Sequence, residues 1–333
     1  MAGVTPSPGI RGGRLATWPV WTGFVGLVVL STAAGALVDP RLRYTPLLAS
    51  VVVFGVPHGA ADYLVPARLG DTSLAASVAV VGAVYLLLGG GYAVLWFHAP
   101  VAAAVLFVAL TWLHWGQGDV HTLVAGLDAD HLDPTWLRAG TLVVRGGLPM
   151  VVPFLAFPDR YLAVVGAWVG LFGGAVTADH LITPGGRTLG AAAVLAVVGA
   201  VLGAGYRRAG ATRAWRIDAA ETALLLVAFA TVSPVVAVGA YFCAWHSVRH
   251  VARLVALDDA NATPAAGLSR FARQAAPPTV AALLLLVAFG RLVPTAPSTV
   301  AEAAGLYLVF VAVLTVPHVV VVAWMDRREG VWG

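Results

Sequence analysis

A series of apolar stretches, most of them close in length to a membrane crossing, constrains what this chain can fold into. A helix needs about 20 mainly apolar residues to cross the hydrocarbon core of a bilayer. Only 11% of the 333 residues are charged, whereas ordinary soluble domains carry about 25%. We therefore expect an all-α fold, a polytopic integral membrane helix bundle with about ten transmembrane helices, located in the cell membrane as a multi-pass protein. The expected spans are residues 18–38, 45–66, 73–97, 101–123, 140–157, 161–181, 188–205, 219–232, 234–257, 278–293 and 299–324.

The domain organisation follows from where the apolar stretches begin and end. Residues 1–16 contain Gly, Pro and Ser and are expected to form a flexible tail. Residues 17–326 should form a single transmembrane domain, and residues 327–333 a C-terminal tail. The segment from 219 to 257 is too long for one crossing, and we expect a break at Ser233 and Pro234 because proline interrupts a helix.

Charge and cysteine content exclude several classes of function. The formal net charge of +4 is spread over the ends of the loops, without the clustered basic face that nucleic-acid binding needs. Cys243 is the single cysteine of the chain, so an intramolecular disulfide and a cysteine-based metal cluster are both excluded.

Four histidines in the apolar stretches are candidates for a metal site. His246 and His250 are one helical turn apart and therefore share a helix face. His58 and His114 lie within the spans 45–66 and 101–123, so all four imidazoles are expected at a similar depth in the bilayer. Ionisable side chains inside a membrane are costly, face the bundle interior and often mark a functional site. Imidazole is a common ligand for Fe, Zn and Cu, and of these Fe and Cu suit oxidation chemistry.

A single histidine inside the membrane could equally form an interhelical hydrogen bond. Four histidines at one depth on three helices favour metal ligation instead. His318 in the last span is a reserve ligand. Asp62, one turn after His58, could accept the second N–H of a ligand imidazole, and Gln117 and Asp119 follow His114. The other histidines are expected outside the site: His98 and His131 in loops, His121 and His180 near the ends of spans.

Aromatic residues are frequent around these histidines and could line a tunnel for a long, flat, apolar substrate. Lipid-interface belts and ordinary packing explain any one of them equally well. They are Phe54, Tyr63, Trp112, Trp115, Tyr241, Phe242 and Trp245.

Three motifs, in this order, resemble the Brp/Blh family, the bacteriorhodopsin-related proteins of prokaryotes that act as β-carotene 15,15'-dioxygenases. They are P-H-G-A-x-D at 57–62, W-x-H-W-G-x-x-D at 112–119, and H-x-x-x-H with a following Arg at 246–253. The resemblance implies that residues 17–326 are a catalytic domain that cleaves the central double bond of β-carotene with O2 to give two molecules of retinal. It also implies an Fe(II) cofactor held by His58, His114, His246 and His250. The lipid bilayer and an opsin that receives the retinal are the further partners it implies.

Two other classes of function remain open on the residues alone. A membrane desaturase or hydroxylase would hold two irons in clustered histidine boxes, and only one short-spaced pair is present here. A transporter of protons or transition metals would use intramembrane histidines and broken helices such as the one at Ser233 and Pro234, although an inverted repeat is missing. The sequence contains no H-E-x-x-H motif, which argues against a membrane zinc protease.

Overall fold

A computed structural model describes residues 17–70, 72–176, 183–259 and 263–332, which form helices joined by turns, with no strand among them. The N-terminal segment 1–16, expected to be a flexible tail, lies outside the described residues. The α-helices are α1 (Trp18–Leu37), α2 (Thr45–Ala49), α3 (Gly55–Ala60), α4 (Val65–Leu69), α5 (Leu74–Val84), α6 (Gly90–His98), α7 (Pro100–Leu127), α8 (Thr135–Ala156), α9 (Pro158–Gly170), α10 (Pro184–Ala209), α11 (Arg213–Thr231), α12 (Pro234–Ala240), α13 (Ser247–Asp258), α14 (Pro264–Leu292) and α15 (Val300–Arg328). Shorter 3-10 turns are η1 (Pro40–Tyr44), η2 (Asp62–Leu64) and η4 (Asp130–Leu132), and π-helical segments are η3 (Tyr85–Gly89) and η5 (Tyr241–His246).

Seven helices among the described residues are long and apolar enough to cross a membrane. They are Trp18–Leu37, Leu74–His98, Pro100–Leu127, Thr135–Ala156, Pro184–Ala209, Pro264–Leu292 and Val300–Arg328. An all-helical chain with seven such helices is consistent with a membrane helix bundle, while the expected number of about ten is not reached by this criterion. The expected break at Ser233 and Pro234 is present, since α11 ends at Thr231 and α12 begins at Pro234.

Helix boundaries follow from local chemistry. Proline has no N–H to satisfy and therefore suits the first turn, where it begins α7, α9, α10, α12 and α14. Hydroxyl side chains accept the free N–H groups at other starts, as Ser73 does for α5. At α15, Thr299 and Glu302 form a reciprocal capping box.

The largest departure from the sequence-based expectation is the segment 45–66, which is not one spanning helix. It contains α2, α3, η2 and the start of α4 instead. A Cβ atom at Gly55 would lie 2.3 Å from the backbone oxygen of Ser50, so this close approach of the chain to itself requires a glycine. The segment places His58 on a two-turn helix inside the bundle.

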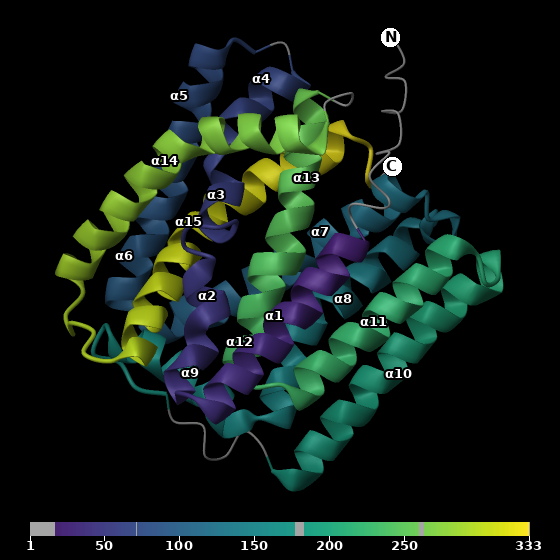
Figure 1. Cartoon of the computed structure of the whole chain (residues 1–333), viewed down its shortest axis with the longest axis horizontal. Coiled ribbons are helices and arrows are strands. Elements are labelled where there is room, and N and C mark those ends of the chain that lie inside the picture. The colour runs from purple at the N-terminus through teal and green to yellow at the C-terminus, as the bar shows by residue number, and fades with distance from the viewer. Residues whose placement is uncertain (1–16, 71, 177–182, 260–262, 333) are drawn as a thin grey trace.

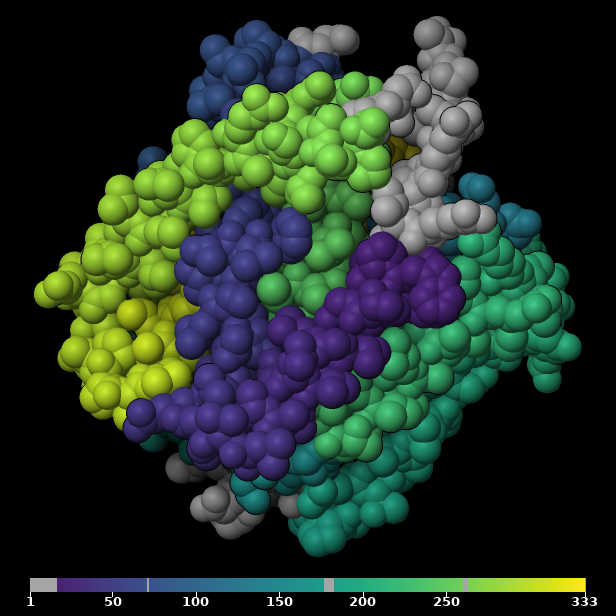
Figure 2. Space-filling model, in the orientation of Figure 1, coloured from purple at the N-terminus to yellow at the C-terminus, as the bar shows by residue number. Residues whose placement is uncertain are grey.

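The arrangement of the helices separates an interior from an outer layer. In Figure 1, α12 and α13 follow one another through the centre of the view, with α1, α8, α10 and α11 on one side and α14, α15, α5 and α6 on the other. Figure 2 shows α1, α14 and α10 on the outer surface of this face. Helices α10 and α14 expose most of their apolar side chains, including Leu189 and Leu285, as expected of helices that face lipid.

Helices α7 and α8 approach so closely that two glycines are required between them. A Cβ atom at Gly116 would lie 2.4 Å from the backbone oxygen of Leu142, and one at Gly146 would lie 1.9 Å from that of Trp112. Small residues at helix interfaces allow such contacts in membrane proteins. This packing determines where α7 presents His114.

The segment assigned from sequence to a C-terminal tail, as far as it is described, packs against the bundle. Val331 is buried, and its backbone oxygen accepts a hydrogen bond of 2.7 Å from Arg138 on α8. Glu329 contacts Arg253 on α13 and lies 3.2 Å from Nε2 of His121 on α7. The end of α15 is thereby joined to three other helices.

Candidate metal centre

Five buried histidine rings from five helical segments gather at one point in the interior. They are His58 on α3, His114 on α7, His246 at the end of η5, His250 on α13 and His318 on α15. The ring centroid of His58 lies 5.4 Å from that of His246, 5.4 Å from that of His250 and 4.9 Å from that of His318. The Nε2 atoms of His114 and His246 are 2.9 Å apart.

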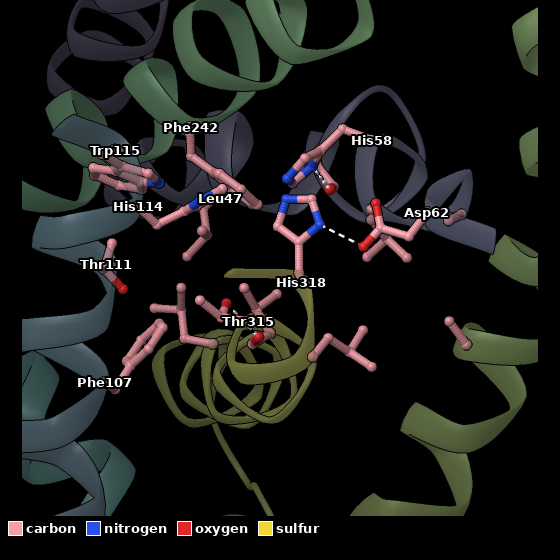
Figure 3. A pocket seen from close by; sticks show the side chains of 18 of the residues that line it. Leu47, His58, Asp62, Phe107, Thr111, His114, Trp115, Phe242, Thr315 and His318 are labelled. Atoms are coloured by element: carbon pink, nitrogen blue, oxygen red, sulfur yellow. Dashed lines mark hydrogen bonds and ion pairs between the residues drawn. The ribbon is translucent and has the colours of Figure 1, made fainter. Parts of the chain in front are cut away.

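Hydrogen bonds to the outer nitrogen set the orientation of two of these rings. Nδ1 of His58 contacts the backbone oxygen atoms of Gly55 and Phe54, which can only accept, so this nitrogen carries the proton and Nε2 keeps its lone pair. Nδ1 of His318 lies 2.7 Å from Oδ2 of Asp62, which also accepts a 2.7 Å hydrogen bond from the Tyr85 hydroxyl. Figure 3 shows Asp62 beside His58 and His318, with a dashed line to His318. Asp62 therefore fixes the tautomer of His318 rather than that of His58.

Three ring nitrogens of the cluster lack hydrogen-bond partners, which is the strongest structural indication of a metal. Nδ1 of His114, Nε2 of His250 and Nε2 of His318 are buried without a hydrogen-bond partner. More than 90% of buried polar groups in proteins are satisfied, so three in one cluster need an explanation. His58, His114 and His318 each offer a nitrogen within 4.8 Å of the others, and Asp62, His250 and His318 form a second such group.

One distance in the cluster matches two nitrogens that share an ion. Two imidazole nitrogens that bind one first-row metal at about 2.1 Å at right angles lie about 3 Å apart, close to the separation of the His114 and His246 nitrogens. Neutral imidazoles suit iron, copper or zinc. The residues present therefore fit an imidazole-rich metal site.

The four histidines that the sequence singled out are all in this cluster, and their ligation of a metal stays a prediction. His318, only a reserve ligand from sequence, contacts the cluster as closely as the others, with its ring centroid 4.7 Å from that of His114 and 5.0 Å from that of His250. The sequence marked it only as an ionisable residue in an apolar span. Its pairing with Asp62 has no local sequence signal.

The remaining histidines lie outside the cluster where they are described. His98 is exposed at the end of α6, and His121 is buried beside Glu329. His131 belongs to the short turn η4 and is buried, with Nε2 3.2 Å from Oδ2 of Asp218, so the expectation of a simple loop residue was incomplete. His180 lies outside the described residues.

A buried ionic network adjoins the cluster on the side of α8 and α11. Arg249, one residue before His250, donates to Oδ1 of Asp119 at 2.9 Å and also contacts Glu221. Arg145 contacts Glu221 and lies 3.4 Å from Asp218. All five side chains are nearly inaccessible to solvent. Buried charges persist only when paired, so this network holds the helix that carries His246 and His250 against α7, α8 and α11.

An apolar cavity of about 570 Å³ borders the cluster. His58, His114 and His318 form part of its wall, whereas His246 and His250 are not among its lining residues. Of the aromatic residues considered for a tunnel, Tyr63, Trp115 and Phe242 line the cavity. Trp112 and Trp245 instead donate to Val143 and Asp119. Figure 3 shows Phe242, Leu47 and Phe107 around the space beside His114.

Comparison with known proteins shows which family the chain belongs to. A model of the β-carotene 15,15'-dioxygenase family matches residues 49–326, a range that contains all five histidines. The protein named "Probable beta-carotene 15,15'-dioxygenase Blh" of Halobacterium salinarum is 52% identical over 314 residues, which cover 92% of this chain and 91% of the relative. "Probable beta-carotene 15,15'-dioxygenase Brp" of the same species is 35% identical over 280 residues, or 74% of each chain. No solved structure matches. The chain belongs to the β-carotene 15,15'-dioxygenase family.

Proposed function

We propose that this protein cleaves the central 15,15' double bond of β-carotene with O2, at an iron held by His58, His114, His246 and His250. The single observation that supports this best is that the buried histidine cluster borders a large apolar cavity of about 570 Å³. His318 offers a further imidazole nitrogen to the same ion. The family membership gives the substrate and the reaction, and the donor set supports iron.

Cleavage breaks the C15–C15' double bond and the O–O bond and forms two C=O bonds. The two central carbons are oxidised and the two oxygen atoms are reduced, with no net gain or loss of protons. An alkene does not react readily with O2, and iron, when bound, would supply the activation of O2. The imidazoles leave the charge of Fe(II) unneutralised and, when four of them bind, leave positions open for other ligands.

The chain itself contributes positioning and exclusion of water. The apolar cavity would hold the polyene so that its central bond lies beside the histidine cluster, and this placement would make the cleavage regiospecific. Phe242 lines the cavity next to His58, and Trp115 lines it next to His246, so both rings would pack against a flat substrate. The cavity holds few polar groups, so it would also keep water from the reacting carbons.

The membrane setting fits a lipid-soluble substrate. The seven long apolar helices would place the protein in the cell membrane as a multi-pass protein, with the cavity inside the bundle. β-Carotene would then enter from the bilayer, and retinal would leave laterally toward an opsin.

Expression in a host that accumulates β-carotene tests this function. The host is expected to lose its carotene colour and form retinal, measured by chromatography of cell extracts. His246→Ala should abolish retinal and lower the iron content of the purified protein, whereas His98→Ala, at an exposed position, should change neither. Intact carotene in cells that contain folded, iron-loaded protein would refute the proposal.

The metal content of the purified protein separates two classes of enzyme. One iron per chain is expected here, measured by plasma mass spectrometry. Two irons per chain would point to a desaturase or hydroxylase instead.

A further inference from the structure

One hydroxyl in the wall of the apolar cavity has no hydrogen-bond partner. Thr111 lies on α7 one helical turn before His114, so the two side chains are neighbours on one helix face. It lines the cavity, only 6% of its surface is exposed, and its Oγ1 atom is buried without a partner. Figure 3 shows Thr111 at the edge of the same space as His114, with its oxygen on the side nearer Phe107.

Thr141 and Thr279 also have buried hydroxyls without a partner, but of these three described threonines only Thr111 lines the apolar cavity. A helical threonine commonly donates to the backbone oxygen four residues earlier. Five described threonines do so, at 2.7 to 3.1 Å. They are Thr22, Thr122, Thr188, Thr231 and Thr315. Thr315 is the informative comparison, because it also lines the cavity but donates to Val311.

The substrate cannot use this hydroxyl before the reaction begins. β-Carotene is a hydrocarbon and has no atom that accepts a conventional hydrogen bond. Acceptors arise beside the cluster only when oxygen is added to the central carbons. A donor in this position therefore interacts with the reacting state and the product but not with the bound substrate, which is the condition for an effect on rate.

We propose that the Thr111 hydroxyl donates a hydrogen bond to the oxygen that cleavage adds to one central carbon, and so to the carbonyl oxygen of retinal in the site. This inference rests on the proposed function and extends it to a residue that the histidine motifs do not include. The hydroxyl keeps its proton throughout, because the reaction has no net proton transfer. Because Thr111 lies on one wall of the cavity, its hydroxyl can donate to the oxygen on only one of the two central carbons.

The chain offers matched variants for the test. Thr111→Val removes the hydroxyl at nearly constant volume, and Thr111→Ser keeps it. Thr315→Val removes a cavity hydroxyl that is already bonded to its own helix. Thr141→Val removes another buried hydroxyl without a partner, on α8, that does not line the cavity.

The first measurement does not depend on turnover. Retinal is added to the purified, metal-free protein, and its C=O stretching band is recorded by infrared spectroscopy. The band is expected at lower frequency in wild type than in hexane, and at the hexane value in Thr111→Val. Thr111→Ser, Thr315→Val and Thr141→Val should keep the wild-type band. The same band in wild type and Thr111→Val, or the absence of a bound-retinal band in a wild type that forms retinal in cells, would overturn the inference.

The second measurement uses the iron-loaded enzyme. Thr111→Val should lower kcat about tenfold, the effect of one hydrogen bond, with KM for β-carotene unchanged. An unchanged kcat, or a rise in KM alone, would count against the proposal. If wild type forms no retinal at all, the proposed function fails; if it does and Thr111→Val behaves identically, only the role of Thr111 fails.

Discussion

The Nδ1 atom of His318 lies 2.7 Å from the Oδ2 atom of Asp62, a contact between residues 256 positions apart. The Tyr85 hydroxyl donates to the same carboxylate oxygen, from a π-helical segment within the span Leu74–His98. Segments of this kind often occur at functional sites because they redirect side chains. The helix α15 is in this way joined to η2 and η3 through the Nδ1 atom of His318 and the carboxylate of Asp62. Carboxylate, imidazole and metal in this order are a frequent arrangement in metalloproteins.

Asp62→Asn should weaken metal binding by about 10- to 100-fold, because the neutral amide no longer holds the His318 ring in one tautomer with the same strength. Tyr85→Phe should have a smaller effect in the same direction, since the Asp62 charge remains. Competition with a chelator measures the affinity. Asp133→Asn, at a side chain that is 59% exposed, is the control and should match wild type. Equal affinities for Asp62→Asn and wild type would contradict the assigned role of the carboxylate.

The sequence predicted the members of the cluster better than their partners. The i, i+4 spacing of His246 and His250 is a local property and survives in the structure as two rings beside His58. The pairing of Asp62 with His318 depends on how α15 packs against η2, and no spacing within either segment encodes that. The sequence accordingly placed Asp62 beside His58, one turn away along the chain.

The segment 45–66 shows the limit of hydropathy as a predictor. Its composition suits a crossing, but a run of apolar residues is equally compatible with buried short helices. The close turn at Gly55, where a Cβ atom would clash with Ser50, is a tertiary constraint that composition does not report. Most other helix boundaries followed their prolines and capping residues.

Gly146→Ala should destabilise the protein by about 1–3 kcal/mol and lower retinal formation, because the added methyl group would meet the backbone oxygen of Trp112 and force α7 away from α8. Thermal unfolding in detergent and retinal yield measure the two effects. Gly199→Ala, on α10 with open space around the added atom, should be neutral or slightly stabilising. A Gly146→Ala protein with the stability and activity of wild type would show that α7 and α8 are less tightly coupled than the contact implies.

Glu221→Gln should cost about 3–5 kcal/mol of unfolding free energy, because it leaves the two buried guanidinium groups of Arg145 and Arg249 with one carboxylate fewer. The Trp21 ring, which donates to Glu221 at 2.8 Å, would report the change through its fluorescence. Asp133→Asn, which removes an exposed ion pair with Arg208, should cost less than about 1 kcal/mol. Similar costs for the two variants would mean that water reaches the network and screens it.

Glu329→Gln tests whether the C-terminal segment holds α15 in place. Burial raises the pKa of the Glu329 carboxyl. The hydrogen bond from His121 and the charge of Arg253 lower the pKa by more than burial raises it, so in the folded protein it lies below its ordinary value of 4.5. A carboxyl with a depressed pKa contributes stability that is present above the ordinary value and is lost as the pH falls through the folded value.

The variant should therefore be less stable than wild type near pH 7, by about 1.5–3 kcal/mol for hydrogen bonds to a charged group. This difference should stay constant down to about pH 5 and shrink below it, because the wild-type carboxyl then becomes neutral like the amide. Thermal unfolding of both proteins in detergent across this pH range measures the difference. A difference that persists unchanged at the lowest pH would show that the Glu329 side chain acts through packing, since the ionic contacts with Arg253 and His121 are by then lost.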